Sequence, residues 1–448
     1  MRRLLLLTSS ATLLAITATA AFIYRNRAHY RAAVLQWRAA VDGISQFASS
    51  IHLREDIRPV FVHPLPILLA VLSRAQRPPP SPPCAEELSA ETLAAASHAL
   101  RFACAAYGHA LMALFGLVPL SPAAPPSPLS SAAPQPEERA CIARYCGLPP
   151  ADLRLLLVGD SSCLAHFVAL DRAHAAVVLA LRGTASLSDA FHDAVAFTHP
   201  FCGGHAHAGM ARMARAVWAA AAEAVLELLA AHPTYTLVLT GHSLGAGTAA
   251  LLTLFLFHER GLRAQPGYAP GGAFPPRRTP IKCFAFAPPP VFEPLAAAPA
   301  GSLEAVVAVV VGADCVPFAS LASGRLLFSR LHALDDAIGA LSSGACGRLA
   351  LGLAPLPPRA LAAVDIKPTD LPLMPGAPTL CIPARVVAWL YPPAEGAPPL
   401  ELHSPARLAD RGITLRASMV ADHMIDVYTA RMADAVAELS CATAQAET

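Results

Sequence analysis

Residues 236–255, TLVLTGHSLGAGTAALLTLF, carry the clearest indication of the fold class. This stretch joins an apolar run, a serine between two glycines, and a second apolar run long enough for a helix. A strand that turns sharply into a helix strains the backbone of the central residue, and flanking glycines remove the Cβ atoms that would clash there. The pattern Gly-His-Ser-Leu-Gly at 241–245 therefore predicts a nucleophilic Ser243 above a sheet edge. The alternative is an ordinary Gly/Ser loop between core elements.

The regions on either side of this stretch alternate between strand-like and helix-like patterns. Short apolar runs predict strands at 166–171, 175–183, 234–240, 282–286, 384–391 and 412–417, and one within 304–314. Longer patterns predict helices at 88–117, 210–231, 244–258 and 329–349, and one from residue 423. Buried strands that alternate with helices predict an α/β class with a mostly parallel central sheet. Together with the serine motif, this organisation predicts an α/β-hydrolase fold.

A serine hydroxyl needs a base, and the base needs an orienting carboxylate. In α/β-hydrolases these residues follow in the order Ser, Asp or Glu, His. Asp314 comes directly after a strongly apolar strand, at the carboxyl edge of the sheet where such sites assemble. Asp314 is therefore the predicted acid. The rivals, none of which follows a strand so directly, are Asp335, Asp336, Asp365 and Asp370.

Four histidines downstream of the serine are candidates for the base, namely His258, His332, His403 and His423. His423 lies in a predicted turn just before the final helix, so it is the preferred base. His403, in a polar stretch, is the runner-up. His242 and His207 are expected to be structural residues.

The overall composition excludes one class of partner and offers no metal motif. The 448 residues carry 33 Lys and Arg against 31 Asp and Glu, and no basic run is interleaved with aromatic residues. Nucleic acid is therefore not expected as a partner. The 11 cysteines include no CxxC pair, and Cys141 and Cys146 do not complete a zinc site. They predict mostly buried reduced thiols, with one or two disulfides left open.

The N-terminus has the features of a membrane anchor or a targeting segment. Residues 4–24 are uncharged and lie between basic residues. At about 1.5 Å per residue, this length matches a hydrocarbon core of about 30 Å. A signal anchor is the preferred interpretation. A cleaved signal peptide and a transit peptide are the alternatives, and they would make the protein secreted or organelle-targeted.

Composition also suggests the domain organisation. We expect an anchor or targeting segment over 1–27, a helical region with a Pro-rich linker over 28–98, and a catalytic domain over 99–448. Pro-rich insertions are expected near 119–136 and 353–383. The second insertion could be a lid, a regulatory loop or disordered filler.

Several motifs resemble a known family. From about residue 99 onward the chain resembles the class 3 lipases, and within them most of all the sn-1-specific diacylglycerol lipase branch. The motifs, which come in the family's order, are LALRGT at 179–184, HAGM at 207–210, TGHSLGAG at 240–247, GADCVP at 312–317 and ADHMIDVY at 421–428. ACAAYG at 103–108 and RGTASLSDAFHD at 182–193 add to the resemblance.

The resemblance implies a role for each matched residue. Ser243 would be the nucleophile, Asp314 the orienting acid and His423 the general base, with the backbone N–H groups of Thr184 and Leu244 as the oxyanion hole. The implied activity is that of a serine lipase hydrolysing an acyl ester of diacylglycerol, at the sn-1 position, through an acyl-enzyme.

The resemblance also bears on partners and alternatives. It implies action at a membrane surface and no cofactor, with calcium possible but not indicated; the oligomeric state is open. A phospholipase A1 or galactolipase of the same fold is the alternative enzyme. A catalytically dead lipase-fold module that binds lipid or a partner protein is the alternative outside enzymes.

Overall fold

A computed structural model describes most of the chain from residue 61 onward. The described residues are 61–76, 84, 87–119, 136–159, 163–184, 198–265, 272–367, 370–371, 379–391, 400–409, 412–416 and 418–446. The predicted anchor over 1–27 and residues 120–135 of the first Pro-rich insertion lie outside them. Among the described helices, none combines the length and apolar character that a membrane span requires.

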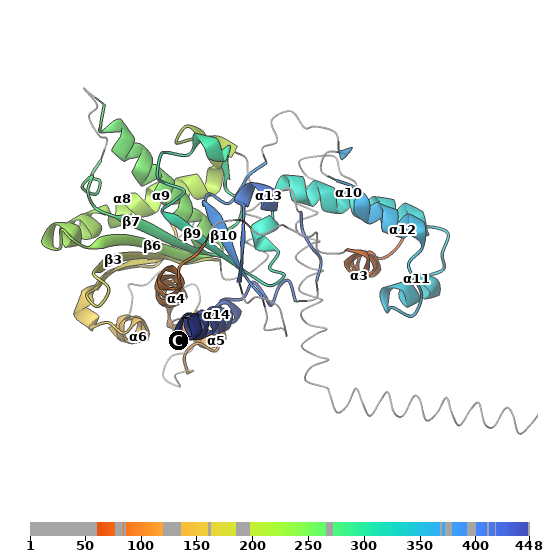
Figure 1. The fold of residues 1–448 in the computed structure, drawn as a ribbon, viewed down its shortest axis with the longest axis horizontal. Helices are drawn as coiled ribbons and strands as arrows, with labels where there is room; N and C mark the ends of the chain where they lie inside the picture. Colours follow the sequence, from red (N-terminus) through yellow and green to blue (C-terminus); the bar gives the residue numbers. More distant parts are fainter. Residues whose placement is uncertain are drawn as a thin grey trace, which may run out of the picture.

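An eight-stranded sheet forms the centre of the molecule (Figure 1), with strand order β1-β2-β3-β6-β7-β9-β10-β11. The five strands from β3 to β10 run parallel, and β1, β2 and β11 extend the sheet in antiparallel pairing. The predicted mostly parallel α/β sheet is therefore confirmed. The strands are β1 (Leu153–Leu157), β2 (His166–Asp171), β3 (Ala176–Leu181), β6 (Thr236–His242), β7 (Ile281–Phe286), β9 (Val306–Val311), β10 (Val386–Leu390) and β11 (Leu400–His403).

Helices cover both faces of this sheet (Figure 1). Helices α8 (Ala208–Ala231) and α9 (Leu244–Leu262) lie on one face, and α4 (Ala90–Ala105), α6 (Pro136–Cys146) and α14 (Ile425–Ala446) lie on the other. Strand β3 is buried along its whole length because it contributes to both cores. Val177 and Leu179 join the core under α8 and α9, whereas Val178 joins the core under α4. Both faces of a central parallel strand are buried, and for this reason its sequence is an unbroken apolar run.

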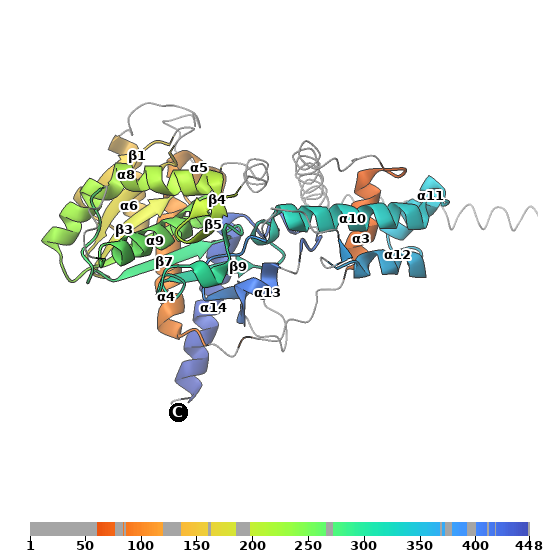
Figure 2. The same cartoon turned by 90° about the horizontal axis from the view of Figure 1, so that it is seen from above.

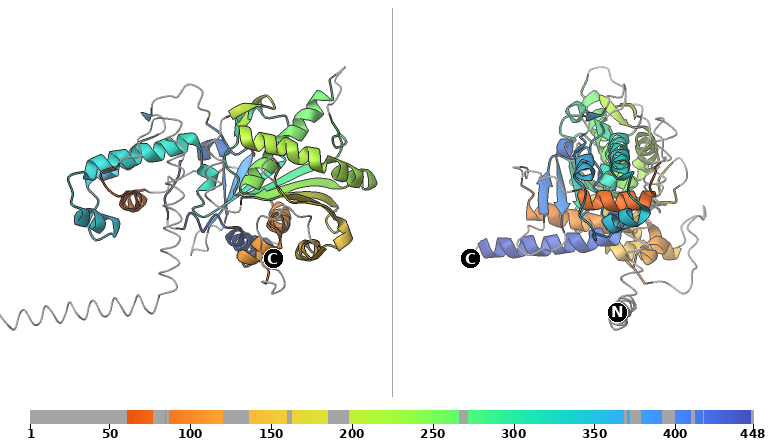
Figure 3. Two further views of the ribbon diagram at one scale, coloured as in Figure 1. Left: turned by 180° about the vertical axis from the view of Figure 1, so that it is seen from behind. Right: turned by 90° about the vertical axis from the view of Figure 1, so that its right-hand side faces the viewer.

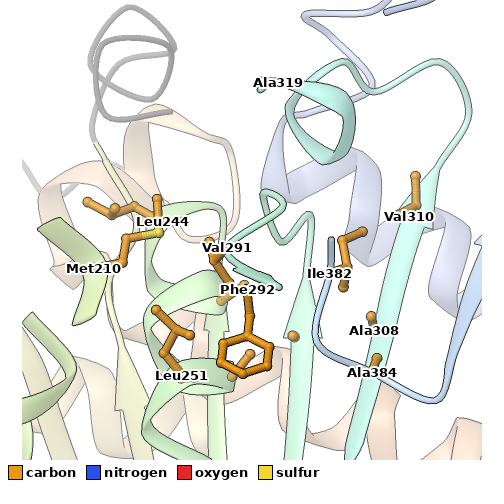
Figure 4. Close-up of a cluster of buried hydrophobic side chains, with 14 of the residues drawn as sticks. Met210, Leu244, Leu251, Val291, Phe292, Ala308, Val310, Ala319, Ile382 and Ala384 are labelled. Carbon is orange, nitrogen blue, oxygen red and sulfur yellow. The ribbon is translucent and has the colours of Figure 1, made fainter. Parts of the chain in front are cut away.

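The core under α9 reaches a second, small sheet. This sheet has the order β4-β5-β8 and consists of β4 (Thr198–Phe201), β5 (Gly204–His207) and β8 (Phe292–Glu293). Figure 4 shows that Leu251 of α9 gathers with Val291 and Phe292 on this side of the central sheet. The far end of α14, by contrast, extends beyond the body of the molecule (Figure 3, right).

The chain segment that connects β9 to β10 forms a helical arm, which projects from the sheet (Figures 1 and 2). It consists of α10 (Leu321–Ile338), α11 (Ser343–Ala350), α12 (Pro358–Ala362) and η4 (Ala363–Asp365), and α3 (Leu65–Ala75) from the N-terminal side packs on it. Asp335 fastens the two parts, because its carboxylate accepts hydrogen bonds from the backbone N–H of Val62 at 2.6 Å and lies 2.7 Å from His63 Nδ1. Helix α12 lies within the second Pro-rich insertion, so residues 358–362 of that insertion are helical.

Two of the predicted helices are interrupted. The helix predicted over 329–349 is wrong, because α10 ends before Gly339 and the Ser342 side chain caps a new helix by accepting from the Ala345 N–H at 3.3 Å. The helix predicted over 88–117 divides into α4 and α5 (Gly108–Leu114). At that break Gly108 has a φ of 77°, a left-handed conformation that favours glycine.

The strand predicted at 412–417 is also wrong. Residues 412–416 form no strand, and the N–H of Leu415 donates to the side chain of Gln76 at 2.8 Å instead of to a neighbouring strand. The Arg416 guanidinium likewise donates to the Ser73 carbonyl at the end of α3. The sheet edge is completed by β11, which the sequence patterns did not predict.

Candidate active site

Ser243 occupies a sharp turn between β6 and α9. Its φ of 58° and ψ of −125° are an uncommon conformation for a non-glycine residue, of the kind that costs about 1–3 kcal/mol. A Cβ atom on Gly241 would lie 2.5 Å from the carbonyl carbon of Gly245, and one on Gly245 would lie 2.5 Å from the Leu181 carbonyl oxygen. The two glycines are therefore required for the turn, and the predicted strand–turn–helix is confirmed.

The structure brings the predicted serine, histidine and aspartate together from distant parts of the chain. His423 Nε2 lies 2.9 Å from Ser243 Oγ, and His423 Nδ1 lies 3.0 Å from both carboxylate oxygens of Asp314. All three residues are buried, with exposed fractions of 1% for Ser243, 0% for Asp314 and 5% for His423. The serine hydroxyl, the imidazole ring and the carboxylate are thus joined in a continuous hydrogen-bonded line, the arrangement of a Ser-His-Asp triad.

Asp314 is held by donors besides the histidine. The Tyr428 hydroxyl donates to Oδ2 at 2.7 Å, and the Val316 N–H donates to Oδ1 at 2.9 Å. Burial and then the negative charge of Asp314 raise the pKa of Tyr428 well above its ordinary value. Tyr428 thus remains a protonated donor, which stabilises the buried carboxylate as an anion. Sequence reasoning missed Tyr428, although it ends the ADHMIDVY motif.

A second aspartate fixes the turn that carries His423. Asp422 Oδ2 accepts hydrogen bonds from the Ala313 N–H and from the Ser418 hydroxyl, both at 2.8 Å. It therefore joins the loop of Asp314 to the turn of His423. Gly312 has a φ of 51°, and a Cβ there would lie 2.6 Å from the Asp422 carboxylate. These contacts explain the glycine of the GADCVP motif and the aspartate before His423.

The neighbouring histidine has a different environment. His242 Nδ1 lies 2.8 Å from the Tyr107 hydroxyl, and its ring is buried. Burial, and then the charge of nearby His423, lower the pKa of His242 well below its ordinary value. A neutral ring packed under the turn is a structural element, as the sequence suggested. His207 is buried as well, and its Nδ1 accepts from the Met210 N–H at the start of α8.

The rival residues lie elsewhere. Asp335 pairs with His63 in the helical arm, and His403 of β11 pairs with Glu401 at 3.2 Å. Neither residue is part of the hydrogen-bonded line at Ser243.

The two predicted oxyanion-hole residues lie next to the serine turn. Leu244 is the first residue of α9, where backbone N–H groups point out of the helix. Thr184 follows β3 after Gly183, and a Cβ on Gly183 would lie 3.3 Å from the Ser243 Cβ and 2.5 Å from the His242 carbonyl oxygen. The chain before Thr184 therefore runs directly against the serine turn, which only glycine permits.

Part of the chain is similar in sequence to known lipases. Residues 178–323 match the family model of class 3 lipases. The chain is also similar to diacylglycerol lipase-beta of Mus musculus, with 31% identity over 182 residues. That match covers 38% of this chain and 24% of the relative, so the chain spans about a quarter of the relative's length.

Solved lipase structures show weaker overall similarity. The lipase from Rhizopus microsporus var. chinensis is 17% identical, with a TM-score of 0.43 and coverage of 78% of this chain and 92% of that one. Lipase II from Rhizopus niveus is 17% identical, with a TM-score of 0.40 and coverage of 70% and 86%. The fold assignment depends on the sheet order and the serine turn described above.

Proposed function

We propose that the protein is a serine carboxylic ester hydrolase that cleaves an acyl ester of diacylglycerol. The observation that carries the proposal is the line from Ser243 Oγ through the His423 ring to the Asp314 carboxylate, with distances of 2.9 and 3.0 Å. A buried line of this kind is suited to nucleophilic catalysis, because an unassisted hydroxyl is a weak nucleophile.

The reaction proceeds in two halves. His423 Nε2 takes the proton of Ser243 as Oγ attacks the acyl carbonyl carbon, and a tetrahedral oxyanion forms. The oxyanion collapses, the bond to the glycerol oxygen breaks, and His423 gives that oxygen its proton. His423 then deprotonates a water that attacks the acyl-enzyme, and the fatty acid leaves as Ser243 regains its proton. Asp314 holds the ring tautomer and stabilises the imidazolium.

The backbone N–H groups of Leu244 and Thr184 are the proposed oxyanion donors. Support comes from their places next to the serine turn: Leu244 is the first residue of α9, and Thr184 directly follows Gly183, which packs against the turn. One such donor typically lowers the barrier by about 3 kcal/mol.

The family match and the named relative support the proposed substrate class. The matched family is one of lipases, and the relative is named as a diacylglycerol lipase. We propose the sn-1 ester as the bond cleaved and a membrane surface as the place of action. A metal or organic cofactor has no part in the proposed reaction.

The test uses the full chain and its Ser243→Ala variant. Removing the nucleophile should lower kcat on diacylglycerol by about 10⁶-fold, as in other enzymes whose serine and histidine act as a unit. A fluorophosphonate probe should label the wild type at Ser243 and leave the variant unlabelled. Ser302→Ala is the matched control, because Ser302 is also buried but lies before β9, away from the serine turn.

Two outcomes would contradict the proposal. Unchanged turnover in Ser243→Ala would show that another residue carries the reaction. A wild-type protein that neither hydrolyses esters nor reacts with the probe would favour a lipid-binding module. Diacylglycerols labelled at either the sn-1 or the sn-2 chain, with phospholipid and galactolipid compared in the same assay, decide the bond and the lipid class.

A further inference from the structure

A second cluster of catalytic-type side chains lies at the opposite edge of the sheet. His98 is on α4, Asp171 is the last residue of β2, and His174 is in the turn that leads to β3. His98 Nε2 lies 2.6 Å and His174 Nδ1 lies 3.0 Å from the same oxygen, Asp171 Oδ2. One donor atom from each of the three residues falls within 4.8 Å of the others.

The turn between β2 and β3 orients the Asp171 carboxylate. Asp171 Oδ1 accepts from the backbone N–H of His174 at 3.4 Å, which leaves Oδ2 for the two rings. The neighbouring Arg172 bonds Asp152 instead, so its charge is neutralised elsewhere. The Asp171 carboxylate therefore presents one oxygen to both imidazole rings.

The cluster is accessible from solution. The side chain of His98 is 22% exposed and that of His174 is 53% exposed, whereas Asp171 is buried. A cavity of about 120 Å³ adjoins the cluster and is lined by all three residues together with Thr236, Lys282 and Phe284. The two imidazole rings stack with centroids 3.7 Å apart, so they approach the carboxylate from the same side.

We propose that His98, Asp171 and His174 bind a divalent transition-metal ion, with zinc as the best match. Two imidazole nitrogens and one carboxylate oxygen are a donor set that zinc prefers, and three protein ligands leave one position open. That position would face the cavity and hold water or a small anion. On binding, the proton that each ring directs at Asp171 moves to its other nitrogen, so both rings stay neutral and present a lone pair to the ion.

The ion would fasten α4 to the β2–β3 hairpin. These ligands come from two elements 73 residues apart, so binding couples to the folded state and should stabilise it. The three ligands precede the part of the chain that matches the lipase family, and the cluster lies at the edge of the sheet opposite to Ser243. Metal binding here is therefore independent of the proposed ester hydrolysis.

The test measures zinc and cobalt binding by the full chain after treatment with a chelator and its removal. Calorimetry should give one tight zinc site in the wild type, and zinc should raise the Tm by several degrees. His98→Ala and His174→Ala should each weaken zinc binding at least tenfold and abolish most of the Tm shift. His232→Ala is the matched control, since His232 lies beside Tyr235 near the same sheet edge but outside the cluster.

The readouts distinguish the site from other metal binding and from misfolding. His174 is the most exposed of the three ligands, so His174→Ala should keep the wild-type far-ultraviolet circular dichroism. No zinc binding by the wild type, or equal binding by both variants and wild type, would overturn the proposal. A cobalt spectrum dominated by thiolate charge transfer would overturn it too, because it would assign the ion to cysteines.

Discussion

The two edges of the central sheet each carry an aspartate paired with histidine, but they differ in the third partner. At the carboxyl edge the far nitrogen of His423 meets the hydroxyl of Ser243. At the opposite edge a second histidine converges on the same oxygen of Asp171. At the first edge the Ser243 hydroxyl can pass its proton to His423. At the second edge two imidazole rings share one carboxylate oxygen, which brings three potential metal ligands together.

The aspartate–histidine pairs at the two edges also differ in how deeply they are buried. Asp314 is fully buried and has Tyr428 and the Val316 N–H as further donors, so its geometry is fixed from several sides. Asp171 is buried too, but the ring of His174 is half exposed. The same pair of residue types thus has different chemistry because its surroundings differ, and substitutions at each edge measure that difference.

The largest expected effect among these substitutions is that of Asp314→Asn. Asparagine preserves the shape but presents an N–H to His423, which favours the wrong ring tautomer. We expect kcat to fall by about 10⁴-fold with KM little changed, as for the corresponding change in other triads. Steady-state kinetics on a soluble ester check this. Asp336→Asn, on the exposed side of α10, is the control; an equal loss there would contradict the assignment.

A smaller effect is expected from Tyr428→Phe. The change removes one hydrogen bond to the Asp314 carboxylate, and a bond to a charged group contributes about 1.5–3 kcal/mol. We expect kcat to fall by about tenfold, with KM unchanged, because the lost contact supports the triad and not the substrate. Tyr391→Phe, which removes a hydroxyl bonded to Glu401, is the control. A loss confined to KM would show that Tyr428 has no part in positioning Asp314.

The smallest expected effect concerns Asp171→Asn in the metal-free protein, measured as the free energy of unfolding at several pH values. The folded-state pKa of Asp171 lies below its ordinary value of 3.8. The contribution of Asp171 to the free energy of unfolding is therefore present above pH 3.8, and it is lost as the pH falls through the lower, folded-state pKa. We expect the variant to be about 1 kcal/mol less stable at pH 7, with the gap closing in acid. A gap independent of pH would contradict this, and Asp336→Asn again serves as the control.

Much of the fold and the candidate triad could be predicted from the sequence because their signals are local. An apolar run followed by Gly-His-Ser-Leu-Gly specifies a strand, a turn and a helix, and the chain places Asp314 directly after another strand. The strand predicted at 412–417 failed because its partner is distant in the sequence. Residues 412–416 have a strand-like pattern, yet Gln76 and not a strand satisfies Leu415.

The class of fold, the serine turn and the order of the candidate triad residues could be predicted from sequence alone, because steric and hydrophobic preferences act over a few neighbouring residues. The contact of Tyr428 with Asp314 and the link that Asp422 makes between the loops of Asp314 and His423 are visible only in the folded chain. The contact of His98 with Asp171 is visible only there as well. Such contacts depend on the distance and angle between elements far apart in the chain, and no local pattern of residues encodes those quantities.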